Sequence, residues 1–140
     1  HRELLATREQ EYDRRVAGRI KQGAGVNAAD YYDMLRKRAD LNARVSRITS
    51  DYDALLCPTV PIVAPAIAPL ERDDDHYVKT NLAVLRNTTA FNFLDRCAVA
   101  LPMHRAGDAP TSLMVVGEPM TDRTLLGVAA AIESVFAERK

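Results

Sequence analysis

The sequence predicts an α/β fold, in which short strands of a sheet are covered by helices on both faces. Three apolar runs have the length of buried strands, and longer segments around them repeat apolar residues at helical spacing. Strands this short and apolar need covering on both faces, and three of them alone would leave unpaired edges. We therefore expect them to belong to a larger mixed sheet.

A helical hairpin is predicted for about residues 3–50. The first helix is expected to run from Glu3 to about Gly23, because apolar residues recur at near-helical spacing among charges and glycines then end the pattern. Asn27 can cap the second helix, with Asp30 in the position of a capping-box acid. Apolar residues then hold one face for about five turns, as in a helix that packs along its length.

About residues 53–69 are predicted to form a strand followed by a Pro-rich segment. Asp53–Cys57 is an apolar run ended by Pro58, which suits a buried strand. Four of the chain's seven prolines then alternate with Val, Ile and Ala. This composition favours an extended segment lying on an apolar surface over a flexible linker. Glu71–Asp75 is expected to be an acidic surface loop.

The remainder, about residues 77–140, is predicted to be α/β. A helix is expected from Tyr77 to about Phe93, broken at Asn87, and two apolar strands follow at Ala98–Pro102 and Ser112–Gly117. A last helix follows Thr121. Thr121 is expected to cap this helix, and Arg139 and Lys140 are expected to form its basic C-terminal end. The residues of its expected apolar stripe are Leu125, Val128, Ala129, Ile132 and Phe136.

Charge and composition exclude several classes of function. Lys plus Arg and Asp plus Glu are 19 each, so the net charge of +0 argues against binding nucleic acid through a broad cationic face. No apolar run approaches the roughly 18 residues of a membrane helix. Two cysteines without metal-type spacing favour a cytoplasmic protein without a metal site. Because the chain starts at His1, we expect it to be one piece of a longer protein.

The residues alone offer no complete active site. None of the serines has the spacing of a known nucleophile motif, and both cysteines adjoin apolar strand sequences, as small buried hydrophobes do. His104 follows a strand at the start of a loop, a position that often carries function in α/β proteins. The alternative is a loop histidine that is hydrogen-bonded to local backbone.

Four segments agree in order and spacing with one enzyme family. They are Arg19–Gly23, Asp51–Pro61, Asn92 with Ala98–Pro102, and Ala109–Gly117. From about Arg19 to its end, the chain resembles the C-terminal part of the amidase signature family. It departs from the family pattern at Asp95 and Cys97, where the family has Gly and Pro, and at Ser112 and Met114, where it has Gly and Gln.

The resemblance implies that residues 1–140 are the C-terminal portion of a single amidase domain. Family members hydrolyse amides with a Ser–cis-Ser–Lys triad that precedes this segment, so no catalytic residue and no cofactor is expected here. The expected partners are the N-terminal part of the same domain, a small-molecule amide, and a second copy in a homodimer. Two alternatives stay open: a non-catalytic α/β interaction module, and the A subunit of a tRNA-dependent amidotransferase.

Two residues are expected to bind substrate. In some family members an arginine near the position of Arg19 holds a substrate carboxylate, which a guanidinium suits because its fork of donors matches two oxygens. His104 could hydrogen-bond a polar substrate. Both favour a small acidic substrate, such as the carboxylated ureas carboxybiuret or allophanate. The alternatives are a salt-bridged arginine and a structural histidine.

Overall fold

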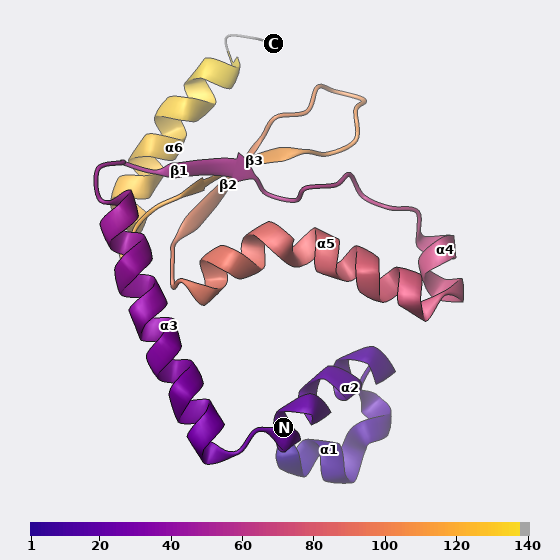
Figure 1. Ribbon diagram of the computed structural model, residues 1–140. Helices are drawn as coiled ribbons and strands as arrows, with labels where there is room; N and C mark the ends of the chain where they lie inside the picture. The colour runs from indigo at the N-terminus through magenta and orange to yellow at the C-terminus, as the bar shows by residue number, and fades with distance from the viewer. Residues whose placement is uncertain (138–140) are drawn as a thin grey trace. The chain divides into compact units, whose positions relative to one another are not determined.

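The computed structural model describes residues 1–137 and divides the chain into two compact units (Figure 1). The first unit is His1–Asp40 and the second begins at Leu41. The predicted Arg139 and Lys140 at the end of the last helix lie outside the described residues.

The first unit is helical, but its first helix is interrupted. Helix α1, Arg2–Arg8, continues into a 3₁₀ turn, and α2 begins anew at Arg14 and ends at Gln22. The expectation of one helix from Glu3 to about Gly23 was therefore wrong. Asp13 marks the break: its carboxylate accepts the backbone N–H groups of Arg15 and Val16 as an N-cap, which stabilises a new helix start at this point.

Helix α3, Ala28–Thr49, starts where its cap predicted. The Asn27 side-chain oxygen accepts the backbone N–H of Asp30 at 2.9 Å, and its amide nitrogen donates to the Asp30 carboxylate at 2.7 Å. Asp30 thus closes the cap through its side chain, in place of the Glu of the usual capping box. The helix continues from the first unit into the second, in which its last two turns lie.

The second unit contains a three-stranded antiparallel sheet. Its strands are β1 (Leu55–Pro58), β2 (Ala98–Pro102) and β3 (Ser112–Val116), in the order β1-β3-β2. In the central strand, Val115 lies opposite both Leu56 and Val99. Because β1 is an edge strand with alternating exposure, the expectation of a buried strand there was wrong, whereas the α/β fold is confirmed.

Helix α6, Asp122–Ala137, closes one face of this sheet. It begins directly after Thr121, whose hydroxyl donates to the Glu118 carbonyl at 2.8 Å. The predicted stripe is confirmed, since Leu125 and Ala129 form a buried cluster with Leu101 and Val115. The remaining stripe residues pack against that cluster: Val128, Ile132 and Phe136.

Helix α5, Asp74–Phe93, runs along the sheet on the side away from α6 (Figure 1). It is not broken at Asn87, contrary to expectation; the Asn87 amide instead donates to the carbonyl of Pro58 at 2.7 Å. The expectation of an acidic loop at Glu71–Asp75 was also wrong. A short helix, α4 (Ile67–Arg72), precedes α5, and Asp73 caps α5 by accepting the backbone N–H of His76.

No helix among residues 1–137 combines the length and the apolar character that a bilayer-crossing segment requires.

Candidate functional site

Arg19 lies in the first unit, on the solvent-exposed side of α2. Its neighbour Lys21 pairs with Glu9 at 2.6 Å, which ties α2 to the preceding 3₁₀ turn. The inward residue of α2 is Ala17, which is buried. The buried position of α2 is therefore a small residue, and Arg19 is exposed on the same helix.

His104 lies in the second unit, in the loop between β2 and β3. It is half-buried, and its Nδ1 is 3.2 Å from the backbone carbonyl of Thr111, across the base of the loop. The backbone N–H of Met103 donates to the same carbonyl at 3.0 Å. One ring nitrogen is thus in contact with local backbone.

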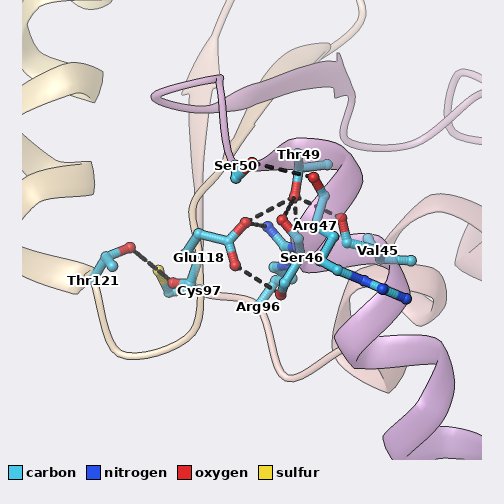
Figure 2. Close-up of polar contacts among 9 residues, drawn as sticks. All are labelled: Val45, Ser46, Arg47, Thr49, Ser50, Arg96, Cys97, Glu118 and Thr121. Carbon is cyan, nitrogen blue, oxygen red and sulfur yellow. Dashed lines mark hydrogen bonds and ion pairs between the residues drawn. The ribbon is translucent and has the colours of Figure 1, made fainter.

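A charged network lies at a different place in the second unit, and sequence reasoning missed it. Arg96, just before β2, is almost fully buried, with its side chain 3% exposed. Its guanidinium donates to the Glu118 carboxylate, to the Thr49 hydroxyl at 2.9 Å and to the Ser46 hydroxyl at 3.3 Å (Figure 2). Ser46 and Thr49 both belong to the last turns of α3. One side chain therefore joins the end of α3, the start of β2 and the segment after β3.

Glu118 is the acceptor at the centre of this network. Thr49 and Ser46 donate their hydroxyls to its two carboxylate oxygens at 2.8 and 3.0 Å. Partial burial acts to raise the pKa of Glu118, but the hydrogen bonds from Thr49 and Ser46 and the charge of Arg96 outweigh it, so the pKa is lowered. The carboxylate is ionised at neutral pH.

These groups do not form a hydrolytic site. A general base works best when its pKa is near the working pH, and the lowered pKa of Glu118 makes it a weak base toward Ser46. Cys57 is half-buried, and burial raises the pKa of its thiol, which disfavours the nucleophilic thiolate. Within residues 1–137, no group of three or more His, Cys, Asp and Glu side chains is arranged to hold a metal ion.

Two backbone positions beside the network restrict the residues that can occupy them. Asp95, at the departure from the family's glycine, has φ +55°, a left-handed conformation that Gly adopts freely and Asp tolerates better than most residues. Asn42 of α3 donates its side-chain amide to the Asp95 carboxylate at 3.4 Å. Gly117 is required by close packing: an added Cβ would lie 2.8 Å from the Thr121 hydroxyl and 3.1 Å from the Cys97 sulfur.

The only sequence signals for the network are single charges beside apolar strands. Arg96 precedes β2, and Glu118 follows the glycine that ends β3. Their partners on α3 are 47 to 72 residues away in sequence. A single charge at a strand end is common on protein surfaces, so the pairing becomes evident only from the fold.

Comparisons with known proteins agree with this fold. The profile of the family described as Amidase matches residues 2–126. A 2-amino-5-chloromuconic acid deaminase from Comamonas testosteroni is 31% identical over 127 residues, or 88% of this chain and 27% of that protein. The A subunit of the glutamyl-tRNA(Gln) amidotransferase of Saccharolobus solfataricus is 28% identical over 94% of this chain and 28% of its own length.

A solved structure described as an amidase has the same fold. It superposes with a TM-score of 0.78 at 23% identity, covering 96% of this chain and 31% of that structure. The chain thus spans between a quarter and a third of these three proteins.

Proposed function

Because this chain belongs to the amidase family, we propose that the whole protein hydrolyses a carbon–nitrogen bond of a small molecule that carries a carboxylate. The observation that carries the proposal is the family match over nearly the entire chain. This segment would supply packing and part of the substrate-binding surface. The nucleophile and its base would come from the rest of the domain, since residues 1–137 offer no such pair.

The exposed apolar side chains support such a partner. Large hydrophobic residues on every helix of the second unit, and on its edge strand, are exposed; examples are Ile48, Leu56, Ile67, Leu82 and Leu126. Apolar side chains stabilise a domain when another part of it removes them from water. The rest of the amidase domain is the occupant that we propose for them.

The choice of an acidic substrate depends on Arg19 and His104. Arg19 offers an exposed guanidinium, whose fork of donors suits a carboxylate, and His104 offers a half-buried imidazole. The relative from Comamonas testosteroni is named for a substrate that is itself a carboxylic acid. Carboxybiuret and allophanate are the candidate substrates, because each combines a urea-type amide with a carboxylate.

The test is kinetic and uses the full-length protein. Arg19→Ala should lower kcat/KM by a factor that corresponds to about 2–5 kcal/mol of lost transition-state stabilisation, the cost of removing one partner of a desolvated charge pair. The melting temperature of this variant should not fall. His104→Ala should lose about 1–2 kcal/mol, as for a neutral hydrogen bond. Lys21→Ala is the control, because it removes a positive charge from the same helix and should keep the wild-type value.

Two results would contradict the proposal. If Arg19→Ala has the wild-type kcat/KM, then Arg19 does not bind substrate and its role is structural. Glutamine-dependent transamidation by the full-length protein would show that it is an amidotransferase subunit and not a small-molecule amidase. We do not expect this result, because Leu82–Arg86 lacks the acidic residue that the family resemblance leads us to expect in an amidotransferase.

A further inference from the structure

The two strands that flank β3 end at the same edge of the sheet. Both β1 and β2 are antiparallel to β3, so they run parallel to one another, and Figure 1 shows the chain leaving both strands on one side. Thr59 comes directly after β1, His104 comes two residues after β2, and Ser112 begins β3 at this edge. In open α/β sheets, ligands bind outside the carboxyl ends of parallel strands. The polar groups at this edge are therefore candidates for contact with substrate.

Ser112 and Thr59 form a hydrogen-bonded pair at this edge. The Ser112 hydroxyl donates to Thr59 Oγ1 at 2.7 Å, and the Thr59 hydroxyl donates to the backbone carbonyl of Ser112 at 3.3 Å. The backbone N–H of Thr59 donates to the same carbonyl at 3.0 Å. A hydroxyl group has one hydrogen and two lone pairs. Both hydroxyl hydrogens are therefore used within the pair, and each oxygen keeps a lone pair that can accept a further hydrogen bond.

The pair lies on the face of the sheet that α6 does not cover. Side chains alternate along a strand, and Val115, three residues after Ser112, belongs to the cluster under α6. Ser112 consequently points to the opposite face, beside Pro102 of β2, its partner in the register. Pro102 and Ala100, which lies on the same face, are exposed, whereas Ser112 and Thr59 are half-buried. The two hydroxyls are thus held in place by their neighbours without being part of the α6 core.

His104 adds a third acceptor near the pair. Its Nδ1 is 3.2 Å from the backbone carbonyl of Thr111, the residue that precedes Ser112. Because a carbonyl only accepts, this contact is a hydrogen bond when Nδ1 carries the proton of the neutral ring, and Nε2 is then an acceptor. Three neutral acceptors at one edge suit a group that has several N–H donors and no charge. The –NH2 group of a primary amide or urea is such a group.

We propose that Ser112 and Thr59 bind the –NH2 group of the substrate and so make the protein selective for primary amides and ureas over esters. The inference rests on the function proposed above and defines its substrate class more narrowly. Ser112 stands where the family resemblance has glycine, so this acceptor is a feature of this chain. An ester has no hydrogen on its leaving oxygen, and it gains nothing from either hydroxyl.

The experiment compares two substrates with the same acyl group in the full-length protein. Malonamate carries an –NH2 group, and monomethyl malonate has a methoxy group in its place. Ser112→Ala should lower kcat/KM for malonamate, and for allophanate if the protein hydrolyses it, by about fivefold, the effect of one lost neutral hydrogen bond. The value for monomethyl malonate should stay within about twofold of wild type, because the ester makes no such bond. Each variant is compared with wild type on the same substrate, so the intrinsic reactivity of the substrate cancels.

Further variants separate selectivity from general damage. Thr59→Val should lower the value for malonamate in the same way, because the Ser112 hydroxyl loses its acceptor and can turn to donate. Thr59→Ser keeps the acceptor and should keep the wild-type ratio between the two substrates. Ser134→Ala is the matched control: Ser134 lies on α6, is exposed and donates its hydroxyl to the carbonyl of Ala131 at 2.8 Å. That variant should change neither value.

The two proposals fail in different ways. If Ser112→Ala and Thr59→Val keep the wild-type ratio of kcat/KM for malonamate to that for monomethyl malonate, the pair has only a structural role and the inference is overturned. This holds whether the two values are unchanged or fall together, and it leaves the proposed function untouched. A wild-type protein that hydrolyses neither malonamate nor allophanate would contradict the proposed function, and the inference would fail with it.

Discussion

Helices α6 and α3 have similar sequence patterns and different surroundings. Both carry an apolar stripe at helical spacing. On α6 the stripe is inside, with Leu125 2% and Ala129 3% exposed, whereas on α3 Tyr31 is 57% and Leu35 46% exposed. Near its end, where Leu41 and Val45 are half-buried, α3 also makes inward hydrogen bonds from Ser46 and Thr49.

The difference shows where each helix finds its partners. The partners of α6 are β2 and β3, which this chain supplies, so its stripe is buried. The stripe of α3 has the composition of a packed face but is largely exposed in this segment, and the partner that we propose for it is the rest of a larger domain. Hydrophobic patterning therefore predicts that a face will be buried, and not whether its partner lies within the same stretch of sequence.

The largest expected effect is in the α6 core. Leu125→Ala should destabilise the full-length protein by about 3 kcal/mol, because it removes buried methyl groups from the cluster with Leu101 and Val115 and leaves a cavity. The measurement is chemical denaturation at constant m-value. Leu35→Ala on α3 sharpens the comparison, since a loss above about 1 kcal/mol there would report packing against the rest of the protein. A loss below about 1 kcal/mol for Leu125→Ala would contradict the α6 core.

A smaller effect on stability, which depends on pH, is expected when the hydrogen bonds between the end of α3 and Glu118 are removed. The folded protein lowers the pKa of Glu118 below its ordinary value of 4.5, so the carboxylate contributes stability that is fully present above that pH. The contribution is lost as pH falls through the lowered value. Glu118→Gln should cost about 1–2 kcal/mol at pH 7, discounted because the side chain is one-third exposed.

Thermal unfolding of the two full-length proteins across pH measures this. The difference in melting temperature between wild type and Glu118→Gln should be constant above about pH 4.5. It should become smaller as the pH falls below that value. A difference that persists unchanged in acid would assign the effect to lost packing and not to the charge.

The parts that could be predicted are those governed by local sequence. The α6 stripe, the strands after residue 97 and the Asn27 cap all follow from spacing within a few residues. The interruption at Asp13 escapes such reasoning because a single acid among many charges looks like part of a helix face. The Arg96–Glu118 network could not be predicted, because its members meet only after the sheet has formed. Asp95 departs from a family glycine, and its positive φ explains why few residues can replace that glycine.

The smallest expected effect concerns the turn that joins Glu118 to α6. The backbone N–H of Thr121 donates to the Glu118 carbonyl at 3.3 Å, with Pro119 at the second turn position and Met120 at the third. Met120 has φ +62°, where a glycine is preferred, and its side chain is 94% exposed. Met120→Gly should therefore stabilise the full-length protein by about 0.5–1 kcal/mol, since the relief of left-handed strain exceeds the entropy that glycine adds to the unfolded chain. Met120→Ala keeps the strain and loses no packing, so its denaturation midpoint should match that of wild type. A stabilising Met120→Ala, or a destabilising Met120→Gly, would show that the exposed methionine side chain has a role in the full-length protein beyond the turn.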